Sequence, residues 1–210
     1  MTTFFTSDLH LGHKNIIEYC NRPFHSVGEM NDAIMARWIT TVTPQDTVYI
    51  LGDLAMGSID ESLALVALLP GNKILVPGNH DRVWSGYYKK GVRDIDLERY
   101  QAAGLTIAAE QVRYTGFKAP GSTYPASWTL CHFPDAGDSR PGADRYTESR
   151  PPAPMPGSIL VHGHVHTAWK FNGPRVNVGV DMWNFAPVPE ETIYGFWKWG
   201  FADPSWFSGE

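Results

Sequence analysis

The chain has 210 residues, of which 43% are hydrophobic and 19% charged, and its formal net charge is -5. This length fits one domain, residues 1–210, with an ordinary hydrophobic core, and the composition is unlike that of a disordered chain. The acidic balance argues against a basic surface for duplex nucleic acid. We therefore expect one globular domain that does not bind duplex nucleic acid.

The sequence contains few features that indicate the cellular compartment of the protein. The cysteines, Cys20 and Cys131, form neither a CxxC motif nor a disulfide framework, which is typical of reduced thiols. Apolar runs stay below the roughly 18 residues of a membrane span, and residues 1–20 lack a basic segment followed by an apolar one. We expect a cytoplasmic protein with no membrane partner and no obligate protein partner.

The first half of the sequence alternates predicted strands with predicted helices. The strands are apolar runs at Thr2–Ser7, Thr47–Leu51 and Lys73–Val76. Helices are predicted over Lys14–Tyr19, after capping-box sequences that begin at Ser26 and Ser58, and over Asp94–Ala103. This alternation is typical of an α/β fold with parallel strands.

The second half contains short strand-like runs. They are Leu105–Ala108, Gln111–Tyr114, Ser127–Leu130, Ser158–Val161, Thr167–Phe171, Arg175–Val178 and Thr192–Trp197. Their close spacing and the turn sequence Asn172-Gly173 favour antiparallel hairpins. A Pro-rich insertion at about 133–157 is predicted to be a loop, and loops of this length in compact domains usually cover a functional site or are disordered.

Side chains that can bind a metal follow several of the predicted strands. They are Asp8, His10, Asp53, Asn79, His80, Asp81, His132, His164 and His166. Imidazole and carboxylate ligands without cysteine favour a divalent ion such as Mn, Fe, Co or Zn over a structural thiolate zinc. The set is too large for one tetrahedral ion and suits two ions, which together clamp the attacking and leaving oxygens of a phosphoryl displacement.

The motifs D-x-H, G-D, G-N-H-D, H and G-H-x-H, in this order from Asp8 to His166, resemble those of the calcineurin-like metallophosphoesterases. The resemblance implies an α/β fold in which two mixed β-sheets pack as a sandwich with helices on the outside. It also implies a phosphoester hydrolase with two divalent ions, Mn first and Fe, Zn, Co or Ni as alternatives. The nucleophile would be a metal-held hydroxide.

The same resemblance assigns roles by position. One ion would be held by Asp8, His10, Asp53 and His166, and the other by Asp53, Asn79, His132 and His164. His80 would contact the scissile phosphate and protonate the leaving group. Asp81 would either orient His80 or cap the next helix.

The sequence constrains the substrate less closely. Asp53 is followed by Leu54-Ala55-Met56 and not by the Asp-Arg-Gly of protein phosphatases, while the segments 7–13 and 177–184 resemble a small phage or bacterial branch. This favours a phosphodiesterase acting on small or nucleotide substrates, for example 2',3'-cyclic nucleotides. A phosphomonoesterase is the alternative, and a non-catalytic metal-binding scaffold ranks below both.

Three residues are candidates for substrate binding. His13 would either reach the substrate phosphate or begin the helix at Lys14. Trp183 and Asn184 are candidate substrate contacts, although aromatic residues near the C-terminus more often belong to the core. Arg140, Arg145 and Arg150 in the insertion would either grip a phosphate or nucleotide or simply be solvated.

Overall fold

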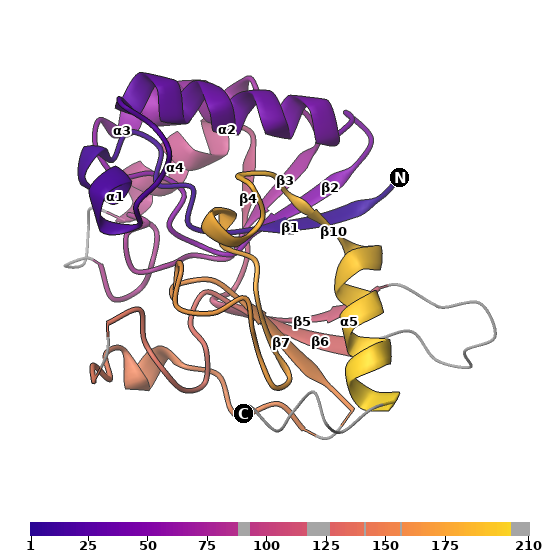
Figure 1. Ribbon diagram of the computed structural model, residues 1–210. Coiled ribbons are helices and arrows are strands. Elements are labelled where there is room, and N and C mark those ends of the chain that lie inside the picture. Colours follow the sequence, from indigo (N-terminus) through magenta and orange to yellow (C-terminus); the bar gives the residue numbers. More distant parts are fainter. Residues whose placement is uncertain (88–92, 117–126, 141, 156, 203–210) are drawn as a thin grey trace.

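The computed structural model of the protein describes residues 1–87, 93–116, 127–140, 142–155 and 157–202 (Figure 1). The first half comprises β1 (Thr3–Thr6), α1 (Lys14–Tyr19), α2 (Val27–Thr41), β2 (Thr47–Ile50), α3 (Ile59–Ala67), β3 (Asn72–Leu75), α4 (Arg93–Ala102) and β4 (Leu105–Ile107). The second half comprises β5 (Gln111–Thr115), β6 (Ser127–Cys131), the 3-10 helix η1 (Thr147–Ser149), β7 (Ile159–His162), β8 (Phe171–Asn172), β9 (Arg175–Asn177), the 3-10 helix η2 (Val180–Met182), β10 (Val188–Pro189) and α5 (Glu190–Ala202).

The strands of the described residues form two mixed five-stranded sheets. In the first, of order β10-β1-β2-β3-β4, the strands β1 to β4 are parallel and β10 is antiparallel to β1. In the second, of order β5-β6-β7-β9-β8, β7 is parallel to both β6 and β9, while the outer pairs are antiparallel. The predicted two-sheet α/β fold is confirmed, whereas the expected hairpins occur only as these outer pairs.

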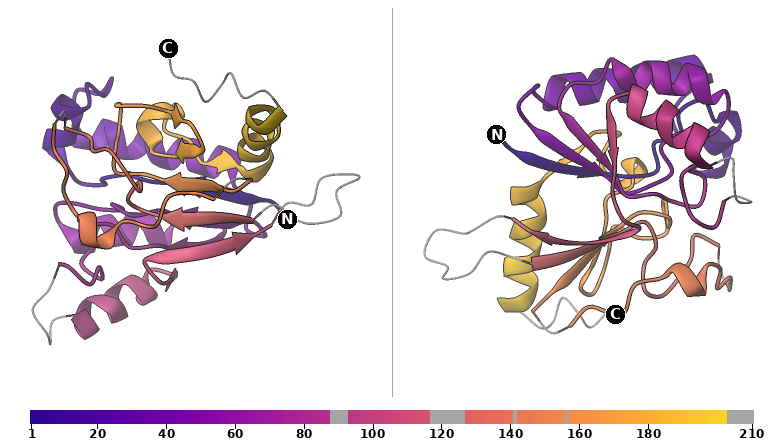
Figure 2. Two further views of the ribbon diagram at one scale, coloured as in Figure 1. Left: turned by 90° about the horizontal axis from the view of Figure 1, so that it is seen from below. Right: turned by 180° about the vertical axis from the view of Figure 1, so that it is seen from behind.

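The first sheet lies between helices and the second sheet, and the sequence of β1 shows why. Successive side chains of a strand point to opposite faces. Phe4 is buried in a core with Trp38 of α2 and Leu63 of α3. Phe5 faces the other way and packs against Trp128 of β6, with ring centroids 5.8 Å apart. The views of Figure 2 show the resulting layers of helices, first sheet and second sheet.

The segment Thr192–Trp197 was expected to be a strand, and this prediction is wrong because it lies in α5. The acidic pair Glu190-Glu191 in the first turn favours a helix N-terminus. Ile193, which is fully buried, and Trp197 lie one helical turn apart and pack against the core of the second sheet. β-branched and aromatic residues suggested a strand, but burial of this helical face decides the structure.

Smaller differences concern turns and caps. Of the expected strand Thr167–Phe171, only Phe171 is in a strand. Ser26 accepts a hydrogen bond from the backbone of Glu29 at 3.1 Å, as its capping box predicts. Ser58 makes no such bond at the start of α3.

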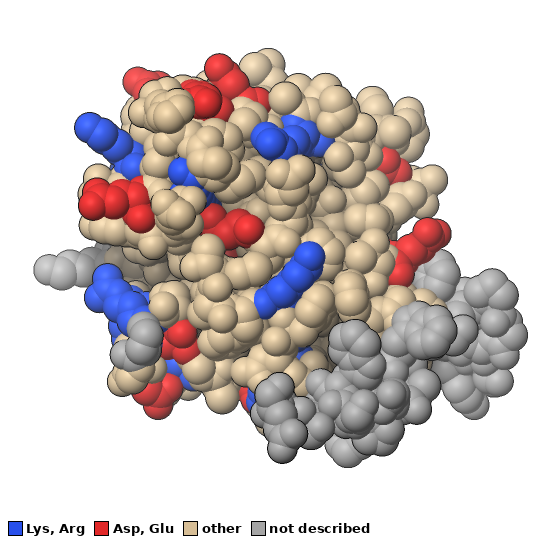
Figure 3. All heavy atoms as spheres, in the orientation of Figure 1, with Lys and Arg blue, Asp and Glu red and all other residues tan. Residues whose placement is uncertain are grey.

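The insertion at 133–157 is irregular apart from η1, as predicted for its described residues. On the face shown in Figure 3, acidic and basic side chains are interspersed. Among the helices of the described part of the chain, none has both the length and the apolar character needed to cross a bilayer.

Candidate metal centre

Hydrogen bonds join the loops that follow the strands of both sheets. The backbone N–H of Asp8 donates to the carbonyl of Gly52, and that of His10 donates to the carbonyl of Asp53, both at 3.0 Å. The backbone N–H of His164, after β7, donates to Oδ2 of Asp8 at 3.0 Å. These bonds bring segments more than 150 residues apart into one cluster, since Asp8 and His164 are separated by 156 positions.

Five of the seven predicted metal ligands have a left-handed backbone conformation. Their φ angles are 57° at Asp8, 51° at His10, 54° at Asp53, 70° at His164 and 47° at His166. Non-glycine residues rarely adopt this region, which costs about 1–3 kcal/mol per residue. Such strain persists only where the surroundings impose it, and its concentration at these ligands is typical of a functional site.

The first group of ligand atoms belongs to Asp8, His10 and His166, which lie within 4.8 Å of one another. The ring centroids of His10 and His166 are 5.2 Å apart. Nε2 of His10 also lies 3.6 Å from Oδ2 of Asp53. These four residues are the set predicted for one ion.

A second group combines Asp8, Asp53 and His132, again within 4.8 Å. Nε2 of His132 lies 3.5 Å from Oδ2 of Asp53 and 3.1 Å from Oδ1 of Asn79. Nδ1 of His132 lies 2.8 Å from the carbonyl oxygen of Leu51. A proton on Nδ1 donated to that carbonyl leaves the lone pair of Nε2 facing Asp53, which is the orientation that a metal ligand needs.

His164 lies beside this second group. Its ring centroid is 5.2 Å from that of His132. Its Nε2 is 3.7 Å from Oδ2 of Asp138, a buried carboxylate of the insertion that the sequence analysis did not single out. The structure therefore brings all seven predicted metal ligands into one region.

The buried ring nitrogens of the histidines indicate whether this region suits a metal ion. Within the described residues, both ring nitrogens of His10 and Nε2 of His164 are buried without a hydrogen-bond partner. A buried polar atom without a partner costs about 1–3 kcal/mol. A divalent ion would accept the imidazole lone pairs, and the imidazole and carboxylate donors are those that borderline divalent ions bind. The residues fit the predicted ions.

The pKa shifts of His10, His164 and Asp53 agree with metal binding. Burial lowers the pKa of His10 well below its usual value and lowers the pKa of His164 to about 3. Burial raises the pKa of Asp53, but His132, His10, His80 and the hydrogen bond from the His80 backbone together lower it below the usual range. Neutral imidazoles and an ionised carboxylate are the forms that coordinate metal ions.

The pKa values of two other candidate ligands, His166 and Asp8, shift the other way in the absence of an ion. Burial lowers the pKa of His166, but Asp8 and Asp181 raise it well above its usual value. Burial raises the pKa of Asp8.

The predicted catalytic pair, His80 and Asp81, has two different environments. The backbone N–H of His80 donates to Oδ1 of Asp53 at 2.9 Å, and its half-exposed imidazole has Nε2 4.0 Å from Oδ2 of Asp53. The buried Asp81 carboxylate accepts backbone N–H bonds from Asp53 (2.8 Å), Leu54 (3.0 Å) and Gly78 (2.8 Å). These bonds make Asp81 a support of the Asp53 loop, and its orientation of His80 stays a prediction.

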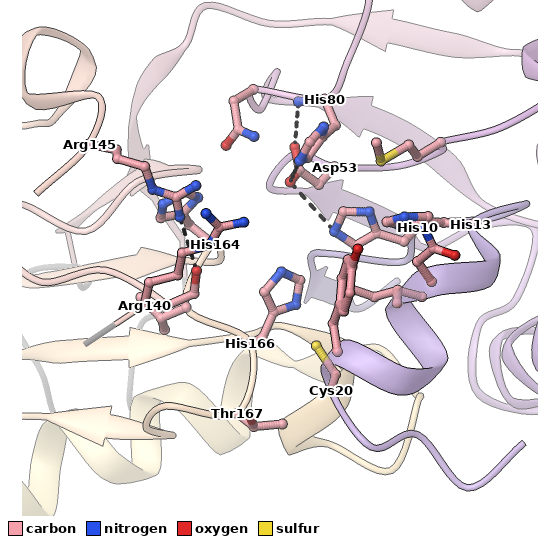
Figure 4. A pocket seen from close by; sticks show the side chains of 17 residues that line it. His10, His13, Cys20, Asp53, His80, Arg140, Arg145, His164, His166 and Thr167 are labelled. Atoms are coloured by element: carbon pink, nitrogen blue, oxygen red, sulfur yellow. Dashed lines mark hydrogen bonds and ion pairs between the residues drawn. The ribbon is translucent and has the colours of Figure 1, made fainter. Parts of the chain in front are cut away.

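The ligand cluster opens into a cavity of about 500 Å³ (Figure 4). Three segments contribute to its wall: the ligands with His80, the residues in and around α1, and the Pro-rich insertion. The wall includes His10, Asp53, Asn79, His80, His164 and His166, then His13, Asn15, Tyr19 and Cys20, and finally Ser139, Arg140 and Arg145.

The three predicted substrate residues differ in position. His13 lines the cavity, and its side chain makes no capping bond to α1. Trp183 and Asn184 are not among the described residues that line it. The indole N–H of Trp183 donates to the carbonyl of Asn177 at 2.7 Å, and its ring packs against Phe171. These contacts are those of the core packing that was the alternative for Trp183, and a substrate contact by Trp183 or Asn184 stays a prediction.

Two further residues that the sequence analysis did not single out support His166. Oδ2 of Asp181 lies 3.2 Å from Nδ1 of His166. The buried guanidinium of Arg22 donates to both carboxylate oxygens of Asp181, at 2.8 and 3.1 Å. A carboxylate on Nδ1 fixes the orientation of the ring and leaves Nε2 for the metal.

Comparisons with known proteins agree with this geometry. Residues 1–168 match the family model described as calcineurin-like phosphoesterase. The chain is 32% identical to the Gene 66 protein of Mycobacterium phage L5, covering 91% of this chain and 92% of the phage protein. It is 30% identical to the uncharacterized protein MJ1445 of Methanocaldococcus jannaschii, covering 90% and 88%.

A solved structure shares the fold. It is the protein of unknown function AQ665 from Aquifex aeolicus, which superposes with a TM-score of 0.64 at 24% identity and covers 93% of this chain and 98% of its own. With the ligand motifs in place and the family matched over most of its length, the chain belongs to the metal-dependent calcineurin-like phosphoesterases.

Proposed function

We propose that this phosphoesterase is a dinuclear phosphodiesterase that hydrolyses small or nucleotide substrates, with 2',3'-cyclic nucleotides as the class to test first. One observation supports the proposal of a dinuclear centre most directly. Oδ2 of Asp53 lies 3.6 Å from Nε2 of His10 and 3.5 Å from Nε2 of His132, so candidate ligands of both ions approach the same carboxylate oxygen. Such a carboxylate suits a pair of ions, for which Mn is our first choice.

The proposed reaction is hydrolysis at phosphorus. When bound, the two ions supply positive charge at the phosphate and lower the pKa of a water molecule. An oxygen atom from water forms a bond to phosphorus, with one proton of the water released to solvent and the other kept on the product phosphate. The bond from phosphorus to the leaving oxygen breaks, and that oxygen takes up a proton. We assign the donation of this proton to His80, whose imidazole lines the cavity beside Asp53.

The size of the cavity favours a small substrate. Its volume of about 500 Å³ lies within the range of small-molecule sites. The formal net charge of -5 also disfavours binding to duplex nucleic acid. We propose a small phosphoester or nucleotide as the partner, without a membrane or an obligate protein partner.

The proposal is tested with purified protein supplied with Mn. Turnover of bis-p-nitrophenyl phosphate should exceed that of p-nitrophenyl phosphate, and a panel of 2',3'-cyclic nucleotides should identify a better substrate. An Asp53→Asn variant purified in parallel detects any contaminating phosphatase. A strong preference for the monoester would instead identify a phosphomonoesterase. A metal-replete protein without turnover on any phosphoester would favour a binding scaffold.

A further inference from the structure

Two arginines of the insertion reach the cavity on the side of His164, as Figure 4 shows. Among the described residues that line the cavity, Arg140 and Arg145 are the ones with a Lys or Arg side chain. We propose that they form a subsite for a second anionic group on the substrate, with phosphate as its simplest form. This inference rests on the proposed function, because the reacting phosphoester is taken to lie at the metal ligands.

A buried carboxylate holds the side chain of Arg145 and the backbone of Arg140. The guanidinium of Arg145 donates to the two carboxylate oxygens of Asp138, at 3.1 Å from Nε and 2.5 Å from Nη2. The backbone N–H of Arg140 donates to Oδ1 of the same carboxylate at 3.1 Å. Bidentate pairing sets the plane of a guanidinium. Asp138 thus gives this part of the insertion a defined structure.

The segment that carries the arginines packs against a metal ligand. Oδ2 of Asp138 is 3.7 Å from Nε2 of His164. The ring of Tyr146 lies 5.5 Å from the ring of His164 and 5.1 Å from the ring of Phe133, centroid to centroid. These contacts place the arginines next to the ligand cluster, within reach of a molecule bound there.

The charges distinguish the two arginines. Asp138 balances the charge of Arg145. For the exposed side chain of Arg140, the described residues provide neither an ion pair nor a hydrogen bond. The ions and His80 already account for the reacting phosphate. The charge of Arg140 therefore suits another anion of the same molecule, as in a nucleoside 2',3'-cyclic phosphate that also carries a 5'-phosphate.

The test compares two substrates that differ only in this second anion: adenosine 2',3'-cyclic phosphate with and without a 5'-phosphate. The wild-type protein should show about tenfold higher kcat/KM for the 5'-phosphorylated compound, as expected of a charge-assisted contact in a partly exposed site. Arg140→Met should bring this ratio close to one, and Arg140→Glu should bring it below one. Arg113→Met removes an exposed arginine of β5, outside the cavity, and should keep the wild-type ratio.

Equilibrium binding separates this inference from the proposed function. Calorimetry would give Kd for adenosine 2',5'-bisphosphate and adenosine 2'-monophosphate with the Mn-loaded protein and with Arg140→Met. If the protein hydrolysed both cyclic phosphates with equal kcat/KM, and bound the bisphosphate and the monophosphate with equal Kd, the subsite alone would be overturned. Absence of turnover on every phosphoester, with the Kd difference retained and dependent on Arg140, would overturn the phosphodiesterase alone.

Discussion

Arg22 and Asp181, 159 residues apart in the sequence, form a buried bidentate ion pair with N–O distances of 2.8 and 3.1 Å. Arg22 also donates to the carbonyl of Asp8 at 2.8 Å, and Asp181 accepts a hydrogen bond from His166 at 3.2 Å. The pair therefore connects the ligand loop after β1 with the ligand loop after β7.

Because of this connection, we predict that disrupting the pair weakens the binding of one ion. Asp181→Leu with Arg22→Met removes both charges, so it avoids the cost of one buried unpaired charge while leaving His166 without its orienting carboxylate. We expect affinity at the ion bound by His166 to fall about 10–100-fold, the usual effect of losing such a partner. Calorimetric titration with Mn should show one weakened and one retained site, with circular dichroism as the check of folding.

The single variant Asp181→Asn serves as the comparison. It leaves the buried charge of Arg22 without a carboxylate partner and should lower the unfolding temperature as well as the Mn affinity. If the double variant bound both ions as the wild type does, the pair would have no role in placing His166.

Gly78 leaves no room for a side chain. An added Cβ would lie 2.6 Å from Oδ1 of Asp53 and 2.8 Å from Cγ of His132. Gly78→Ala should therefore displace two ligands and reduce Mn binding and turnover together, while the far-ultraviolet circular dichroism stays unchanged. Gly28→Ala, whose Cβ would lie 3.9 Å from the nearest atom, Ser26 Oγ, is the matched control and should behave as the wild type. Normal Mn binding by Gly78→Ala would mean that the ligand loops can shift freely.

His80 is expected to act on the leaving group and not on the ions. His80→Ala should lower kcat about 10²–10⁴-fold, the usual contribution of a general acid, with Mn content unchanged. The loss should be smaller for a p-nitrophenolate leaving group, which needs little protonation, than for an alkoxide. An equal loss for both leaving groups, or a loss of bound Mn, would contradict proton donation by His80.

The sequence predicted the parts of the fold in which a local pattern and its tertiary environment agree. Met30, Ile34 and Trp38 recur at helical spacing and are all buried in α2. Where the two disagreed, the prediction failed: Ile193 and Trp197 are typical of strands, yet they lie one turn apart in a helix, Ile193 buried and Trp197 half-buried against the core. Their preference for strands is a weak effect compared with burial of large side chains.

The candidate ligands could be found in the sequence because each belongs to a short motif, whereas the residues that support them could not. The Arg22–Asp181 contact spans 159 positions, and nothing in the sequence of either segment specifies its partner. Asp138 likewise lies in an irregular insertion, where neither periodicity nor a motif marks it. Segment 177–184 resembles a phosphoesterase branch and predicts Trp183 and Asn184 as substrate contacts, but nothing in it marks Asp181 as the partner of His166.

The pairing of two ions across Asp53 is the central claim, and it is tested most directly by electron paramagnetic resonance of the Mn-loaded protein together with its metal content. We predict two Mn ions per chain and an exchange-coupled spectrum, both lost in Asp53→Asn. One Mn ion per chain with an uncoupled spectrum, or an Asp53→Asn variant that keeps the coupled pair, would contradict the claim.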